Sequence, residues 1–257
     1  MKNNKKLLKQ HATRYIEAVY ADALKSAGFV CPDDDLLCWY RLQSAQIVNS
    51  IIFYTRWSCL PVLLDIGYGI IPLFEMPLRI KGVVFNKQID EEILTNPLNG
   101  RIEGAKTIFL DDVQAYVPLG SRTLEVILPE MNSIQTIEEA YRYHKNLHLD
   151  DPMAKSLETD GYGKWGPLSR TMINMALWLD DQEMYPYAIF TADRKVAIYD
   201  AICRKHPNKT ECCRELESWQ RLQKVLEEGT RGAYIAELSH RVEINTQLVK
   251  ARYLSPQ

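Results

Sequence analysis

Two histidines stand at a spacing that could hold a metal ion. His144 and His148 are four residues apart in a segment with helical periodicity, so both imidazoles would lie on one face of a helix. The residues between them are Lys-Asn-Leu, so the glutamate of a His-Glu-x-x-His zinc motif is missing. The same histidines also suit a polar helix end, where the helix dipole favours positive charge. We keep both as candidate metal ligands and expect neither a bound metal nor a cofactor.

Three polar residues in different segments could support catalysis if the fold brought them together. Asp65 lies in a strand-like run, His144 in a helical one and Lys164 in a glycine-containing loop. A hydrolase-type enzyme or a small-molecule-binding protein would place them in a cleft between a sheet and a helical half. Their convergence in one pocket, with perturbed pKa values, would support this alternative.

The loop that contains Lys164 has the sequence Gly-Tyr-Gly-Lys-Trp-Gly-Pro, over residues 161–167. Glycines beside a lysine could cradle an anion at the start of the following helix. The pattern matches neither the P-loop nor the dinucleotide-binding fingerprint, and a flexible linker anchored by Trp165 would need the same residues. Lys164 and Trp165 are therefore a second candidate contact patch, after the one described next.

Aromatic and arginine side chains gather in three strand-like segments of the first half. Arg41, Arg56, Trp57 and Tyr68 would form an aromatic-rich surface if one face of the sheet were uncovered. Such residues dominate the binding energy of protein interfaces. The alternative is that helices cover this face and the aromatic rings belong to the core. We predict these four residues as contacts to a protein partner.

The elements that position these residues begin with an amphipathic helix. Apolar residues recur every three or four positions over residues 4–27, and Gly28 stands where a left-handed cap residue is expected. Three runs rich in β-branched and aromatic residues follow at 36–43, 47–57 and 62–71. This order predicts an α+β fold in which an N-terminal helix packs on an antiparallel β-meander sheet.

The second half of the chain has mainly helical periodicity. Two further strands are predicted at 105–110 and 124–128, before the pattern changes near residue 133. Helices are then expected at 136–148, 168–182, 186–205, 209–228 and 231–251. Short links between these helices favour a C-terminal helical bundle. We expect an antiparallel-sheet domain over 1–130 and a helical domain over 131–257, which could also form one continuous domain.

Motifs in residues 20–71 follow the order helix, strand, strand, strand. They are Leu24-Lys25-x-x-Gly28-Phe29, Trp39-Tyr40-Arg41, Arg56-Trp57-Ser58 and Leu64-Asp65-Ile66-Gly67-Tyr68. With them the segment resembles a family of uncharacterised bacterial domains of unknown function. The family usually places Gln before the Ser of the second strand, where this chain has Tyr54-Thr55. The resemblance implies an α+β fold with an antiparallel sheet and implies no activity; some family members are immunity-like in style.

Net charge, the N-terminal sequence and the cysteine spacing bear on the kind of partner and on the compartment. The formal net charge is −2 over 257 residues, which gives no basis for a nucleic-acid or membrane-surface partner. The lysine-rich start lacks the apolar region of a signal peptide, and the six cysteines have no disulfide-framework spacing, so we expect reduced thiols in a cytoplasmic, bacterial protein. The favoured function is a non-catalytic protein-interaction or immunity-like binding module, with its partner and oligomeric state left open.

Overall fold

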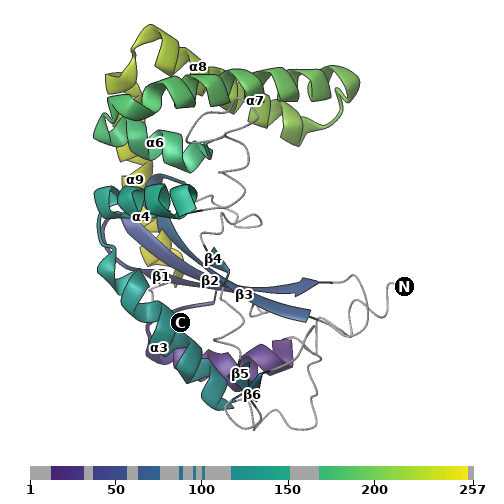
Figure 1. Cartoon of the computed structure of the whole chain (residues 1–257), viewed down its shortest axis with the longest axis vertical. Coiled ribbons are helices and arrows are strands. Elements are labelled where there is room, and N and C mark those ends of the chain that lie inside the picture. The colour runs from purple at the N-terminus through teal and green to yellow at the C-terminus, as the bar shows by residue number, and fades with distance from the viewer. Residues whose placement is uncertain are drawn as a thin grey trace. The chain divides into compact units, whose positions relative to one another are not determined.

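The chain divides into two compact units. Unit 1 comprises Met1–Thr136 and Val242–Gln257, and unit 2 comprises Ile137–Arg241. The computed structural model describes residues 13–31, 37–56, 63–75, 87–88, 95–96, 100–101, 117–150 and 168–253. Figure 1 shows the helices and strands of both units. The fold is α+β, as predicted, with an antiparallel sheet followed by a helical C-terminal region.

The N-terminal helix is present and ends where the sequence predicts. It is helical from residue 13, passes through a π-helical turn η1 (Glu17–Ala21) and continues as α2 (Asp22–Ser26). Gly28 has a φ of 82°, which a residue with a Cβ rarely adopts. The Gly28 N–H donates to the Lys25 carbonyl and the Phe29 N–H to the Leu24 carbonyl, both at 2.9 Å. These two bonds form a Schellman motif, which turns the chain towards the sheet.

The sheet is an antiparallel meander of four strands in the order β1-β2-β3-β4. Its strands are β1 (Cys38–Leu42), β2 (Ile47–Arg56), β3 (Leu63–Pro72) and the short β4 (Lys87–Gln88). The three long strands confirm the predicted runs to within a few residues. The Ser44 Oγ accepts hydrogen bonds from the backbone N–H groups of Gln46 and Ile47, which fixes the turn between β1 and β2. A second hairpin pairs β5 (Thr95–Asn96) with β6 (Gly100–Arg101).

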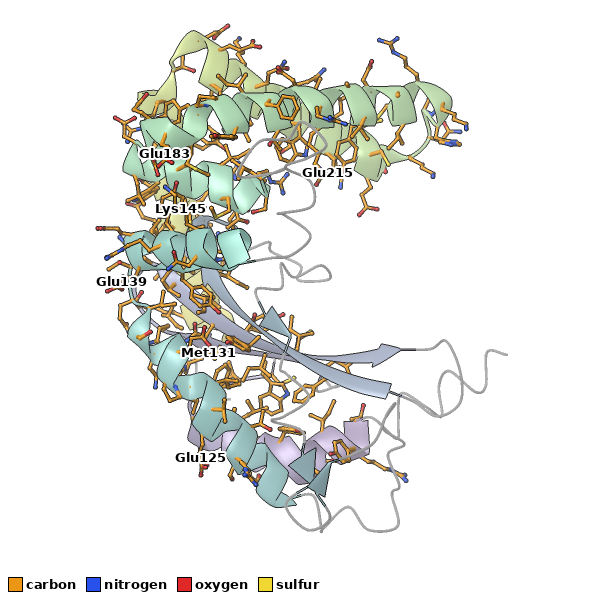
Figure 2. The ribbon with its side chains drawn as sticks, viewed as in Figure 1. Glu125, Met131, Glu139, Lys145, Glu183 and Glu215 are labelled. Carbon is orange, nitrogen blue, oxygen red and sulfur yellow. The ribbon has the colours of Figure 1, made fainter. Side chains whose placement is uncertain are left out.

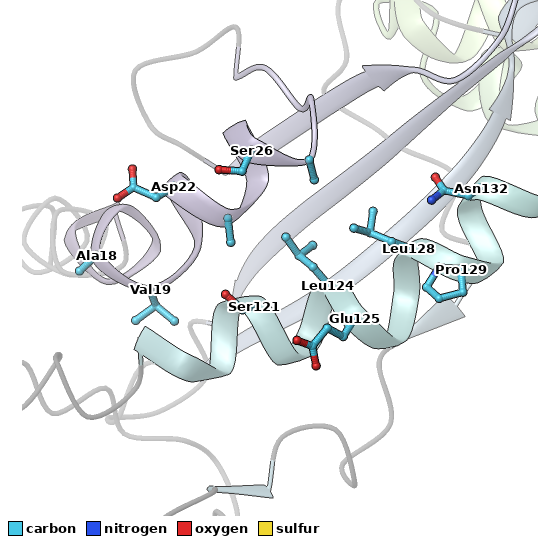
Figure 3. Close-up of a pocket in the computed structure, with 12 residues that line it drawn as sticks. Ala18, Val19, Asp22, Ser26, Ser121, Leu124, Glu125, Leu128, Pro129 and Asn132 are labelled. Carbon is cyan, nitrogen blue, oxygen red and sulfur yellow. The ribbon is translucent and has the colours of Figure 1, made fainter.

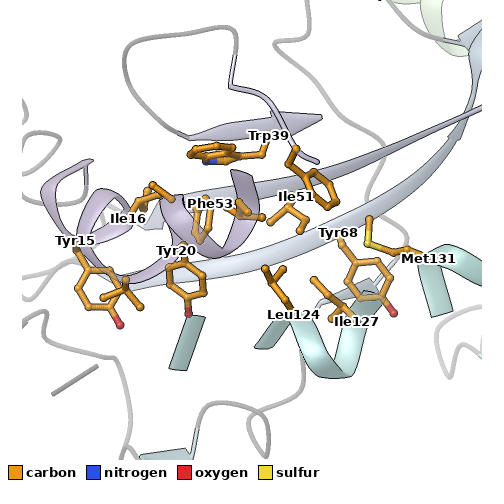
Figure 4. Packing of buried hydrophobic residues seen from close by; sticks show 14 residues of the cluster. Tyr15, Ile16, Tyr20, Trp39, Ile51, Phe53, Tyr68, Leu124, Ile127 and Met131 are labelled. Carbon is orange, nitrogen blue, oxygen red and sulfur yellow. The ribbon is translucent and has the colours of Figure 1, made fainter. Parts of the chain in front are cut away.

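Both faces of the sheet are buried within unit 1. Side chains alternate between the faces, so Trp39, Ile51 and Tyr68, which are register partners, share one face. That face packs against the N-terminal helix and against α3 (Val117–Ser133), as Figure 4 shows. The other face contributes Tyr40 and Val48 to a second cluster with Val249, from the last part of α9 (Arg231–Tyr253).

The prediction of a strand over 124–128 is wrong, because these residues lie inside helix α3. Val126, Ile127 and the following Pro129 resemble a short strand that ends at a turn. The burial of Leu124, Ile127 and Met131 instead follows the spacing of three and four that places residues on one helix face. Val126 is half exposed on the opposite side. The predicted strand over 105–110 lies outside the described residues.

Helix α3 and the π-helical turn approach each other at Gly120. A Cβ built on Gly120 would lie 1.9 Å from the Val19 carbonyl oxygen, far inside the van der Waals limit. Only glycine therefore lets the two backbones pack this closely. The π-helical turn coincides with this crossing, since Val19 lies within η1.

Unit 2 consists of helices whose positions agree closely with the sequence pattern. They are α4 (Ile137–Asp150), α6 (Arg170–Leu179), η6 (Gln182–Met184), α7 (Tyr185–Lys205), α8 (Thr210–Glu228) and the first part of α9. Ser169 caps α6 by accepting from the Met172 N–H, and Gly229 ends α8 with a φ of 65°. In the part of the chain that the structure describes, none of the helices is long and apolar enough to cross a membrane.

Candidate interaction groove

An open groove lies between the N-terminal helix and α3 in unit 1. It has a volume of about 700 Å³. One wall carries the small side chains Ala18, Ala23 and Ala27, and the other carries Leu124 and Leu128 (Figure 3). Small residues on one wall leave room above the larger apolar residues of the other, so the groove results directly from the sequence of the two helices. We call it the interaction groove.

The two ends of the interaction groove differ in their chemistry. At one end, near Val19 and Ser121, the helices are in backbone contact through Gly120. At the other end, Arg41 from β1 reaches both walls. Its Nη1 donates to the Ala27 carbonyl oxygen at 3.2 Å, and its Nη2 donates to Asn132 Oδ1 at 2.6 Å. The groove thus runs from a tight backbone crossing to two lining residues, Ala27 and Asn132, that accept hydrogen bonds from a guanidinium group.

Arg41 is half-buried and surrounded by neutral groups. Its remaining hydrogen-bond acceptor is Gln43 Oε1 at 2.8 Å, and its guanidinium lies 4.8 Å from the centre of the Phe29 ring. The Nε–H is buried and has no acceptor. Among the described residues, no carboxylate forms an ion pair with this side chain. Burial accordingly lowers the pKa of Arg41 from its ordinary value, because desolvation disfavours the charged form.

A hydrogen-bond network holds this end of the groove in place. Gln43 accepts from the buried Asn49 Nδ2 at 3.0 Å and donates to the Asn132 carbonyl at 3.4 Å. The Ser44 hydroxyl donates to the Gln135 carbonyl at 2.5 Å. These bonds connect the β1–β2 hairpin to the end of α3 through its backbone. The Asn132 side chain itself remains exposed at the groove.

The rim of the interaction groove is acidic and polar. Asp22 on α2 and Glu125 on α3 are both exposed, together with Ser26 and Ser121. The groove therefore combines an apolar wall, two carboxylates on the rim and one cation at the end. This arrangement can hold a segment with apolar side chains. Among the described residues, no hydrogen bond joins the Ser26 or Ser121 hydroxyl to either of these carboxylates.

The structure corrects the predicted aromatic surface. Tyr68 is 2 % exposed, and its hydroxyl donates a hydrogen bond to Glu130 of α3. Trp39 and Tyr40 are each 1 % exposed, so these rings belong to the core and not to an open face. The reason is that helices pack on both sides of the sheet. Of the four predicted contact residues, only Arg41 is placed at a groove by the described side chains.

The other predicted residues are placed only in part. The backbones of Arg56 and Asp65 lie in β2 and β3, and their side chains are outside the described residues. Trp57, Lys164 and Trp165 are outside them entirely. The contact and catalytic roles assigned to these five residues stay predictions.

The two histidines both lie on α4 in unit 2. His144 meets the Tyr143 ring edge-on, with centroids 5.9 Å apart, and the side chain of His148 is not described. The described side chains include no group of three or more His, Cys, Asp or Glu that could hold a metal ion. The candidate role of His148 as a metal ligand is not tested by the described side chains.

Unit 2 has its own polar cluster, which is satisfied internally. Asp181 accepts from the Tyr141 hydroxyl at 2.7 Å and from Lys145 Nζ at 2.9 Å, and Lys145 also pairs with Glu183 at 3.3 Å (Lys145 and Glu183 are labelled in Figure 2). Burial opposes ionisation of Asp181, but the bonds from Tyr141 and Lys145 outweigh it and hold the pKa of Asp181 below its ordinary value. Each charged group in this cluster has a partner of opposite charge, which is typical of a cluster that stabilises the fold.

Sequence patterns alone did not reveal the interaction groove. Its alanines at 18, 23 and 27 are a visible signal of a helix face with small side chains. The second wall was missed because residues 124–128 were assigned to a strand, and the Arg41–Asn132 contact joins residues 91 positions apart.

Comparisons with protein-family models, with curated proteins and with solved structures found no match to this chain.

Proposed function

We propose that the protein is a non-catalytic interaction module that binds a segment of a partner protein in the interaction groove. The observation that supports this most directly is the open groove of about 700 Å³, two of whose lining residues, Ala27 and Asn132, accept hydrogen bonds from the half-buried Arg41, which has no acidic partner among the described residues. On the basis of this groove, and of the resemblance of residues 20–71 to a family of uncharacterised bacterial domains, we place the protein among cytoplasmic bacterial binding modules of the immunity-like kind. The proposal includes a protein partner and no nucleic acid.

The exposure of the rim supports a protein segment over a small molecule. Ala18, Asp22, Ser26, Ser121 and Glu125 all line the groove and are exposed to solvent. Sites for small molecules usually enclose most of the ligand surface, which an open groove with so many exposed lining residues does not do. Grooves between helices commonly bind an extended or helical segment that places alternate apolar anchors on the groove wall.

A matched pair of variants tests the proposal. The full-length chain is used to select peptides from a random phage-displayed library, and the affinities of the selected peptides are measured by fluorescence anisotropy. Ser26→Arg places a long side chain in the groove from an exposed position, and we expect it to weaken binding at least about tenfold, as loss of an interface anchor does.

Val126→Arg is the control, because it adds the same charge to α3 at a half-exposed position outside the groove lining. We expect it to leave the affinities unchanged. Equal affinities for wild type and Ser26→Arg across all selected peptides would refute a binding role for the groove.

A further inference from the structure

We infer that Arg41 is a carboxylate receptor, so that the segment bound in the interaction groove carries an acidic side chain beside its apolar anchors. This inference rests on the proposed function and names the chemistry of its partner. It assigns a role to a charged group that contacts two of the residues lining the groove, Ala27 and Asn132.

The first reason is that the charge on Arg41 is only partly compensated. Its three acceptors, from Ala27, Gln43 and Asn132, are neutral, and its Nε–H is buried without an acceptor. Burying a charge without an opposite charge nearby is unfavourable, whereas adding an anion to it gains a charge-assisted bond. A ligand carboxylate would therefore interact with Arg41 more strongly than any of its present partners does.

The second reason is the geometry of access. Arg41 Cζ lies over the Phe29 ring, 4.8 Å from its centre, and the N–H donors of a guanidinium point outward along its edge, so a carboxylate would bind at that edge. Asn132 is at that edge, with Oδ1 2.6 Å from Nη2, and its side chain is exposed in the groove lining. Rotation of this side chain would free the position for a carboxylate oxygen. In the unbound protein, the neutral Asn132 side chain thus occupies the position that the anion would take.

The third reason concerns which anion fits. Asp22 and Glu125 stand on the rim of the same groove, and the chain as a whole has a net charge of −2. A polyanion such as nucleic acid would be repelled by these carboxylates along its length. A single carboxylate at the end of an otherwise apolar or basic segment avoids them. The charges therefore favour an acidic side chain of a protein segment.

The test uses the phage-selected peptides and the full-length chain. We expect the peptides that Ser26→Arg weakens to be enriched in Asp or Glu next to apolar residues. For one such peptide, replacing its acid with Asn or Gln should reduce the affinity about tenfold, the scale of a charge pair with restricted access to water. Arg41→Gln should reduce the affinity of the acidic peptide by a similar factor relative to that of the neutral peptide.

Asn132→Asp is the decisive variant, because it keeps the shape of Asn132 and supplies a resident carboxylate 2.6 Å from Arg41 at the original oxygen position. We expect it to weaken the acidic peptide about tenfold more than it weakens the neutral peptide. If Arg41 has a purely structural role, each peptide should bind Asn132→Asp as tightly as it binds wild type. That result would overturn the inference.

The two proposals fail in different ways. If groove-dependent peptides are selected without enrichment of acids, the carboxylate receptor is refuted while the interaction groove stands. If no selected peptide depends on Ser26, the proposed function is refuted and the inference with it. Circular dichroism of each variant verifies that loss of binding does not come from unfolding.

Discussion

The two units treat their charged side chains differently. In unit 2 some partly buried cations have acidic partners from neighbouring elements, as in Lys145 with Asp181 and Arg231 with Asp180. In unit 1 the half-buried Arg41 contacts only neutral groups. A charge that is paired inside a unit stabilises the fold, whereas one left with neutral partners is available to a ligand. The difference is why we assign binding to unit 1 and a structural role to the cluster around Asp181.

The units also differ in how closely their helices pack. Gly120 in unit 1 allows a backbone contact that any side chain would prevent, whereas Gly232 on α9 in unit 2 has open space around the position of a Cβ. One glycine is required by the fold and the other is not. Replacing each of them by alanine compares the two units directly.

The largest effect is expected for Gly120→Ala. Its Cβ would meet the Val19 carbonyl oxygen at 1.9 Å, and a backbone atom cannot move aside as a flexible side chain can. We expect the free energy of unfolding to fall by about 3 kcal/mol, the upper range for overpacked sites. Urea denaturation measures the loss, and hydrogen exchange should show faster exchange in η1 and α3.

Gly232→Ala is the matched control in unit 2. Alanine has the higher helix propensity and no neighbour lies within 4 Å, so we expect a gain of about 0.5 kcal/mol. If both variants changed stability equally, the close crossing at Gly120 would not be the feature that separates the units.

Local patterns in the sequence were sufficient for most elements and insufficient for α3. The strands and the unit 2 helices have strong periodicity, caps and breaks, such as Gly28 and Gly229, that act within a few residues. Helix α3 contains β-branched residues and Pro129, which favour a strand and a turn. Its helical form is decided by packing of Leu124 and Ile127 on a distant sheet, which a local pattern does not contain.

The candidate site was predictable to a smaller extent. Arg41 was identified from its residue type and strand, but its partner Asn132 lies 91 positions away in the missed helix. The exposure of Tyr68 was wrong because alternation shows which side chains share a face and not which face is covered. A site made of contacts between distant segments needs the fold before it can be recognised.

The second prediction concerns the paired charges of unit 2. Asp181→Asn keeps the size of the side chain and the acceptor for the Glu183 N–H, but it removes the negative charge facing Lys145. Hydrogen bonds to a charged group contribute more than neutral ones, so we expect a loss of about 2 kcal/mol at pH 7. Equilibrium denaturation with urea measures this difference between wild type and variant.

The pH dependence of the same variant supplies its control. The pKa of Asp181 is lowered in the folded protein, so its contribution is complete above the pKa of the unfolded chain and is lost as pH falls through the folded value. The stabilities of wild type and Asp181→Asn should therefore converge below about pH 4, near the ordinary aspartate pKa. A constant difference down to pH 2 would show that the charge is not the cause.

Asn132→Asp should give Arg41 of unit 1 an acidic partner, as Lys145 has in unit 2. The new carboxylate would neutralise Arg41 at a partly exposed position, and we expect a gain of about 0.5–1 kcal/mol at pH 7. Thermal denaturation at pH 7 measures the gain. It should disappear below about pH 4, where the new carboxyl group becomes protonated. A loss of stability at pH 7 would mean that Arg41 is already neutralised by a group of the chain itself.

The smallest effect is expected where a charge pair is fully hydrated. Asp200 and Arg204 on α7 are 2.7 Å apart, with side chains 38 % and 80 % exposed. Water screens such a pair and its flexible side chains lose entropy on pairing, so Asp200→Asn should cost only about 0.3 kcal/mol. Urea denaturation with and without 0.5 M salt measures it, and salt should abolish the difference. A cost approaching that of Asp181→Asn would show that pairing stabilises unit 2 regardless of burial. The contrast between the units would then rest on the number of pairs and not on the desolvated position that makes Arg41 a receptor.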